Sequence, residues 1–164
     1  PGNWQAEFLS PARLRRYIHA DGYALTERGI AQMEANQIQC FVVREGDRLA
    51  HLSYYARKPF LNDDYYAEMD ADVSYEHKAF THPDYRGRGL YPGSLSLAFR
   101  HLQREGVQRV ISEMDARNFA SLRAHRNAGY RRIGFVLLWV RPGKTRVLAS
   151  PGCAAAGCRF RSAE

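Results

Sequence analysis

The stretch Asp84–Gly93, which reads DYRGRGLYPG, decides the fold of this chain because it joins a basic, glycine-rich turn to the start of a helix. Gly87 and Gly89 let the backbone adopt conformations that a Cβ forbids and let it approach a ligand closely. The helix is predicted to begin at about Tyr91, since Pro92 suits a first turn, where a backbone N–H has no partner. The stretch therefore predicts a turn shaped for close contact with a ligand.

The ligand expected at this turn is a phosphate group. Unpaired N–H groups at a helix N-terminus, with the positive end of the helix dipole behind them, bind phosphate well, and Arg86 and Arg88 add fixed positive charge. Two common nucleotide motifs fit poorly. The Gly-Lys-Ser/Thr triplet of a Walker A loop occurs nowhere in the chain, and a dinucleotide fingerprint from Gly87 would need glycine where Pro92 stands. A third kind of nucleotide site is therefore expected.

The composition sets wide bounds on function. The 164 residues suffice for one domain with a substantial core, and a hydrophobic content of 45% is ordinary for a globular protein. The net charge of +7 favours anionic partners such as nucleic acid, phosphorylated cofactors or acidic membranes. A solvated, arginine-rich surface explains the charge equally well. No run of five or six like charges indicates an electrostatic tail.

The three cysteines, Cys40, Cys153 and Cys158, do not form the even-numbered pattern of a disulfide framework. Cys153 and Cys158 have no histidine near them in the sequence, so no metal site is expected. The longest apolar run, Phe135–Val140, is too short to span a bilayer, and no signal peptide is recognisable. These features predict a cytoplasmic protein with no membrane partner.

Hydrophobic periods alternate along the chain between those of strands and those of helices. Strands are predicted at residues 4–9, 40–44, 49–57, 72–81, 108–114, 130–140 and 145–149. Helices are predicted from Ser10–Pro11, from Thr26, over 92–105 with a buried stripe of Leu95, Ala98, Phe99 and Leu102, and from Asn118 to Gly129. Residues 58–71 are expected to form a polar, acidic loop, and residues 150–164 a poorly ordered C-terminal tail. The order predicts a mixed α/β domain over residues 1–149.

Two motifs together resemble those of one enzyme family. Arg86-x-x-Gly89, between a strand and a helix, resembles the pyrophosphate-binding motif of the GNAT superfamily of N-acetyltransferases. Asn118-Phe-Ala-Ser121, followed by His125 and Gly129-Tyr130, resembles a second motif of that family. The resemblance implies an α+β fold: a mixed, mostly antiparallel sheet in which two neighbouring strands splay apart, with helices on both faces. Tyr91 and Pro92 depart from the first motif, because a small residue is usual there, and this predicts a shifted helix start.

The resemblance implies acetyl-CoA as co-substrate, lying between the strands at 72–81 and 108–114. The backbone of the first strand would pair with the pantetheine arm and polarise the thioester carbonyl. The residues implied in cofactor binding are Ala79, Phe80, Thr81, Arg86, Gly87, Arg88, Gly89, Leu90, Tyr91, Gly93, Asn118 and Ser121. No covalent acyl-enzyme is expected, so the cysteines need no nucleophilic role.

Five residues are candidates for proton transfer. His125 stands where the family commonly has a tyrosine that protonates the departing thiolate, although a histidine that only packs or caps is an equal alternative. An amine nucleophile needs a proton acceptor at neutral pH. The candidates are Glu76 and His77 on one of the splayed strands and Glu113 and Asp115 on the other, with Glu76 first and Glu113 second. For each carboxylate the simpler alternative is a surface charge paired with an arginine.

The acceptor is expected to be a primary amine of a small molecule or peptide. The acidic segment Asn62–Asp72 could attract a cationic amine, but a plain solvated loop explains it as well. The rival to an N-acetyltransferase is a catalytically silent acyl-CoA-binding or regulatory domain on the same fold. Nucleic acid is not an expected partner. The oligomeric state stays open, with a homodimer as one option.

Overall fold

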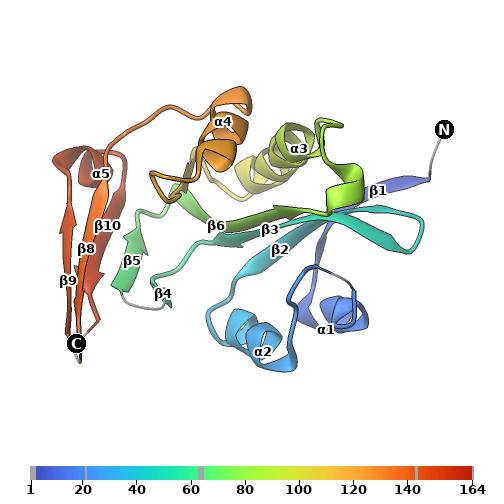
Figure 1. Ribbon diagram of the computed structural model, residues 1–164, viewed down its shortest axis with the longest axis horizontal. Coiled ribbons are helices and arrows are strands. Elements are labelled where there is room, and N and C mark those ends of the chain that lie inside the picture. The colour runs from blue at the N-terminus through green and yellow to red at the C-terminus, as the bar shows by residue number, and fades with distance from the viewer. Residues whose placement is uncertain (1–2, 21, 63–64, 143, 164) are drawn as a thin grey trace.

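A five-stranded sheet forms the centre of the molecule in the computed structural model, which describes residues 3–20, 22–62, 65–142 and 144–163 (Figure 1). Its strands, in spatial order, are β1 (Trp4–Leu9), β2 (Gln39–Glu45), β3 (Arg48–Ala56), β6 (Val73–Thr81) and β7 (Arg109–Ser112). The first four pair antiparallel, and β6 and β7 pair parallel. The predicted mixed, mostly antiparallel sheet is confirmed.

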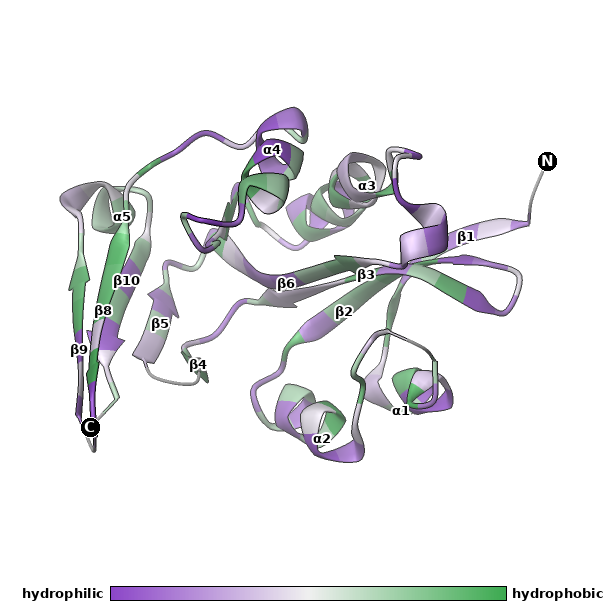
Figure 2. Ribbon diagram, viewed as in Figure 1, coloured by the Kyte–Doolittle hydropathy of each residue, from purple (hydrophilic) through white to green (hydrophobic). Residues whose placement is uncertain are grey.

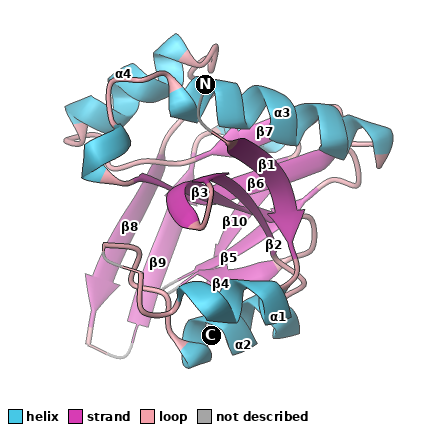
Figure 3. Cartoon of the chain, turned by 90° about the vertical axis from the view of Figure 1, so that its right-hand side faces the viewer, coloured by secondary structure: helices cyan, strands magenta, loops and turns pink. Residues whose placement is uncertain are grey.

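Helices cover both faces of this sheet (Figure 3). The elements on one face are α1 (Pro11–Leu14), which a 3₁₀ turn (Arg15–Tyr17) extends, and α2 (Glu27–Ala35); those on the other are α3 (Leu90–Arg104) and α4 (Phe119–Asn127). Side chains cap two of the predicted helix starts: Thr26 Oγ1 accepts from the Gly29 amide, and Asn118 Oδ1 accepts from the Ser121 amide.

Two apolar clusters fix the helices to the sheet. Leu14, Ile30 and Met33 pack against one face of the sheet. On the other face Ala98 and Leu102 of α3 are fully buried, with Leu95 and Phe99 packed beside them. The predicted stripe of α3 is therefore confirmed, and it places the N-terminus of this helix at the end of β6.

The predicted loop at 58–71 and the predicted C-terminal tail are both wrong, because they pair with each other. Strands β4 (Phe60–Asn62) and β5 (Tyr65–Met69) lie in the predicted loop, and α5 (Pro151–Ala155) and β10 (Cys158–Ser162) lie in the predicted tail. Strand β10 pairs antiparallel with β5, so the sheet order is β10-β5-β4. The small residues that resemble a tail permit close packing: a Cβ at Gly157 would come within 2.9 Å of the Val73 side chain.

The predicted strand at 130–140 is shorter than expected. Strand β8 (Val136–Arg141) pairs with β9 (Lys144–Ala149) as predicted, but residues 130–135 are not in a strand. This hairpin is separate from the five-stranded sheet, and Figure 2 shows β8 as strongly hydrophobic. Its exposed apolar side chains are Leu137, Leu138, Trp139, Val140 and Leu148. Among the described residues, no helix has the length and apolar content needed to cross a membrane.

A buried histidine on β3 makes the stability of the fold depend on pH. His51 is 1% exposed, and its Nδ1 atom lies 2.8 Å from Thr81 Oγ1. Within the described ranges, nothing bonds to its Nε2 atom. Burial without a charged partner disfavours the imidazolium and lowers the pKa of His51 from 6.5 to about 4.

The free energy of unfolding should therefore decrease as the pH falls from 6.5 to about 4, because the unfolded chain binds a proton that the folded chain excludes. The decrease due to His51 is up to about 3 kcal/mol. Urea unfolding across this range should show a flatter pH dependence for His51→Gln than for the wild type. Exposed His19 supplies the control, His19→Gln, which should keep the wild-type slope. Parallel curves for wild type and His51→Gln would contradict the prediction.

Candidate active site

The glycine-rich turn has the conformation that its sequence predicts. Gly87 and Gly89 have φ values of 74° and 70°, in the left-handed region that favours glycine. Gly89 is the N-cap of α3, so the helix begins at Leu90, one residue before the predicted start, and Pro92 lies in its first turn as expected. Gly93 is predicted to bind the cofactor, but its amide donates to the Gly89 carbonyl at 3.2 Å. This N–H is therefore already used within the helix.

The amides before Gly93 are available to a ligand. In the part of the chain that the structure describes, no hydrogen bond uses the N–H groups of residues 87–91. Arg86 donates from Nε to the Thr81 carbonyl at 3.1 Å, which ties the turn to the end of β6. Within the described ranges, neither Arg86 nor Arg88 has a carboxylate partner, and both are exposed. Five amides and two uncompensated guanidinium groups thus surround the start of one helix, which is an arrangement suited to pyrophosphate.

Strands β6 and β7 separate where the family resemblance predicts a splay. They pair in parallel from Val73↔Arg109 to Glu76↔Ser112. Beyond this point β6 continues to Thr81, and no described residue pairs with it on that side. Ala79, Phe80 and Thr81 lie in this continuation, where their other neighbour is β3. Glu76 is therefore the last residue of β6 that pairs with β7.

Glu76 lies at the centre of a buried polar cluster on the α3 and α4 face of the sheet, where Tyr91 of α3 and His125 of α4 contact it. Its Oε2 atom accepts from the hydroxyls of Tyr91 at 2.8 Å and Tyr130 at 2.9 Å. Its Oε1 atom accepts from Tyr55 at 3.2 Å, and His125 Nε2 lies 3.8 Å from Oε2. Burial raises the pKa of Glu76, and the hydrogen bonds from the tyrosines and the nearby His125 oppose the increase. The carboxyl group is 1% exposed, so these side chains enclose it.

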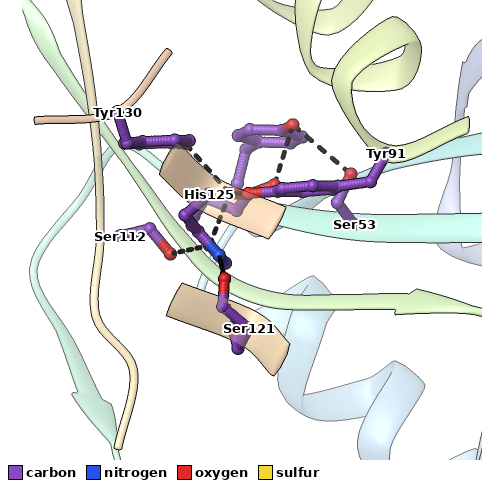
Figure 4. Close-up of polar contacts among 8 residues, drawn as sticks. Ser53, Tyr91, Ser112, Ser121, His125 and Tyr130 are labelled. Atoms are coloured by element: carbon purple, nitrogen blue, oxygen red, sulfur yellow. Dashed lines mark hydrogen bonds and ion pairs between the residues drawn. The ribbon is translucent and has the colours of Figure 1, made fainter. Parts of the chain in front are cut away.

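The contacts of His125 decide which of its nitrogens carries a proton. Nδ1 lies 2.8 Å from the backbone carbonyl of Ser121, which can only accept, so Nδ1 is the donor. Nε2 lies 3.2 Å from Ser112 Oγ and, in neutral imidazole, presents its lone pair (Figure 4). His125 can therefore donate a proton from Nε2 only when both nitrogens are protonated. The structure brings Glu76 and His125 together, as expected for residues that share one site.

The contacts of Tyr91 explain why this chain has a tyrosine where the family motif usually has a small residue. A bulky side chain beside a phosphate site would obstruct the ligand, but this one lies beside His125 (Figure 4), and its hydroxyl donates to Glu76. Its ring lies 4.9 Å from that of His125, measured between centroids. The presence of tyrosine at position 91, where the motif usually has a small residue, thus indicated the contact with Glu76. Tyr130 carried no such signal; its amide donates to the His125 carbonyl at 3.0 Å, just after the C-terminus of α4.

Other candidates lie apart from this cluster. Glu113 is exposed and accepts from the Tyr65 hydroxyl. The amide and carbonyl of Ser121, with Asn118, hold the first turn of α4 and the His125 ring. The described acidic residues of the segment Asn62–Asp72 each form an ion pair with an arginine. The pairs are Glu68–Arg161, Asp70–Arg159 and Asp72–Arg109. Asp63 and Asp64, which belong to the same segment, lie outside the described residues. Within the described ranges, no cluster of side chains is suited to hold a metal ion.

The model of the acetyltransferase (GNAT) family matches residues 5–130, which include the turn, the splay and the Glu76 cluster. This chain belongs to that family. The fold, the splayed strands and the amide-lined turn are thus those of a GNAT N-acetyltransferase, for which acetyl-CoA is the co-substrate. No curated protein matches the chain in sequence.

Solved structures of other proteins share the fold at low sequence identity. The aminoglycoside N-acetyltransferase AAC(6')-Iy in complex with CoA is 13% identical, with a TM-score of 0.67, covering 86% of this chain and 96% of its own. Aminoglycoside 6'-N-acetyltransferase AAC(6')-Ih from Acinetobacter baumannii is 12% identical, with a TM-score of 0.64, covering 85% and 98%. A transcriptional regulator from Bacillus halodurans C-125 is 13% identical, with a TM-score of 0.63, covering 85% and 100%.

Proposed function

We propose that acetyl-CoA binds with its pyrophosphate on the amides of residues 87–91 and its pantetheine arm along Ala79–Thr81. The five free amides at the N-terminus of α3 carry this proposal, because they are preorganised and need no rearrangement to meet an anion. Arg86 and Arg88 strengthen the same site by charge. The thioester would then lie near the end of the β6–β7 pairing, beside Glu76.

The acetyl group passes directly from sulfur to the acceptor nitrogen. A primary amine of a small molecule or peptide attacks the thioester carbonyl, a C–N bond forms, and a backbone amide of β6 stabilises the oxyanion. The C–S bond then breaks, the amine nitrogen loses a proton, and the CoA thiolate gains one. His125, protonated on both nitrogens, is the proposed donor to the thiolate through Nε2.

Glu76 is the proposed acceptor of the amine proton, and it acts through a hydroxyl group. Its burial prevents direct contact with a substrate, whereas the Tyr91 and Tyr130 hydroxyls both donate to Oε2. A tyrosine that passes its proton to Glu76 while it receives one from the amine completes the transfer without a free tyrosinate. Glu113 remains a second, less connected candidate.

Thermal unfolding with and without acetyl-CoA tests whether the protein binds this proposed acetyl donor. The melting temperature should rise with ligand concentration, because a ligand that binds only the folded state stabilises it by mass action. Thiol release with a panel of primary amines then separates an enzyme from a silent binding domain. The enclosed Glu76 is the observation that favours the silent domain. A thermal shift without thiol release from any amine would support that alternative, and the lack of a shift at millimolar acetyl-CoA would contradict both.

A further inference from the structure

A cavity of about 550 Å³ lies between α2 and the sheet. Helix α2 covers the face opposite α3 and α4 (Figure 3). The cavity has an apolar lining that includes Met33 of α2 and Phe60 and Leu61 of β4. It borders β6 at His77 and Lys78, the two residues that follow the last β6–β7 pair. A ligand in this cavity would therefore reach the splay within two residues of Glu76, and its amine would have to extend past the last β6–β7 pair to reach the Tyr91 or Tyr130 hydroxyl.

The charge of the cavity is unusual for a site that takes an amine. Lys78 is the charged residue among the described lining residues, which include no carboxylate. Its Nζ atom lies 5.6 Å from the centroid of the Tyr54 ring, and it makes no ion pair within the described ranges. The remaining polar lining consists of Thr26, Gln32, Asn36, Tyr54 and His77. Among the described lining residues a cation on the acceptor would meet no carboxylate, whereas an anion would meet Lys78.

The surroundings of the cavity also disfavour a polycation. Three carboxylates of the nearby acidic segment are paired with arginines, so their charge is neutralised locally. The chain as a whole carries a net charge of +7. Electrostatic steering by such a protein repels ligands that carry several ammonium groups and attracts ligands with a negative group.

We propose that this cavity is the acceptor site and that its substrate is a primary amine with a carboxylate and an apolar body. The carboxylate pairs with Lys78, and the apolar body packs against Phe60 and Leu61. Amines that carry several positive charges are rejected. This inference rests on the proposed function, since it assigns the acceptor of that reaction, and it names the chemistry that the family alone leaves open.

The test compares phenylalanine, phenylalaninamide and spermidine, which present a carboxylate, a neutral amide and a polycation. Binding to the CoA-loaded protein is measured by titration calorimetry, and thiol release is measured with acetyl-CoA. The wild type should bind phenylalanine about fivefold more tightly than phenylalaninamide, and spermidine least tightly. Lys78→Glu should reverse the order of phenylalanine and phenylalaninamide. Lys144→Glu changes the net charge equally but lies on the β9 hairpin, so it should keep the wild-type order.

The outcomes separate the two proposals. If the wild type binds the three amines in the expected order but releases thiol with none, the proposed acetyl transfer is contradicted, while the assignment of the cavity as an amine-binding site stands. If spermidine binds as tightly as phenylalanine, or if none of the three binds, the cavity proposal is overturned. Equal shifts in Lys78→Glu and Lys144→Glu would also overturn it, because the preference would then come from net charge and not from this cavity.

Discussion

Gly89→Glu is expected to weaken the binding of CoA and acetyl-CoA by about 100-fold or more, without unfolding the protein. The substitution places a carboxylate at the N-cap of α3, where the pyrophosphate would meet free amides. The new charge both repels the ligand and occupies the positive end of the helix dipole. A side chain also strains the left-handed backbone at φ 70°, which displaces the amides beside it.

Gly46→Glu is the matched control for this prediction. Gly46 lies in the β2–β3 turn with φ 58°, and a Cβ there would meet nothing within 4 Å, as at Gly89. Both variants therefore add the same charge and the same kind of backbone strain at open positions. Calorimetric titration with CoA should show wild-type affinity for Gly46→Glu and a large loss for Gly89→Glu, with similar melting temperatures. Equal affinities in the two variants would contradict the assignment of the pyrophosphate to this turn.

The turn is predictable from the sequence because residues close together in the chain determine it. Two glycines, a proline and a helix-forming run lie within one decapeptide, and local chemistry sets the backbone there. The Thr26 and Asn118 caps are predictable for the same reason, since each bonds to an amide three residues later. The spacing of the two motifs then indicates the family, and membership of the family predicts the splay between β6 and β7.

The partners of Glu76 could not be predicted in this way. Tyr91, Tyr55 and Tyr130 lie 15, 21 and 54 residues from Glu76 in the sequence, so only the folded sheet and helices bring their hydroxyls together. The pairing of β10 with β5 has the same cause: it joins segments whose small or polar composition, read locally, is typical of loops. Tertiary packing decided both cases against local composition.

Glu76→Gln is expected to lower kcat by about 100-fold while the KM for acetyl-CoA changes little. Glutamine is close to isosteric with glutamate, and its amide can accept from one tyrosine and donate to another, so the cluster should stay packed. What is lost is the ability to take up a proton. Because the proposed pyrophosphate site lies on a different segment, donor binding should persist.

The pH profile distinguishes proton transfer from a purely structural role. Burial raises the pKa of Glu76, and the proposed acceptor is its ionised form, so kcat of the wild type should fall as the pH drops through this raised pKa. Glu76→Gln has no group that titrates there and should lose this acidic limb. An unchanged acidic limb in the glutamine variant would contradict a proton-accepting role for Glu76.

Tyr91→Phe and Tyr130→Phe show which hydroxyl passes the proton. Each variant removes one donor to Oε2 and leaves the other. The tyrosine on the proton path should lose nearly as much activity as Glu76→Gln, and its double variant with Glu76→Gln should lose little more, because residues that act as one unit are not additive. The other tyrosine should cost about tenfold or less. Wild-type kcat in both phenylalanine variants would show that the amine proton leaves by another path and that Glu76 serves only to hold the cluster.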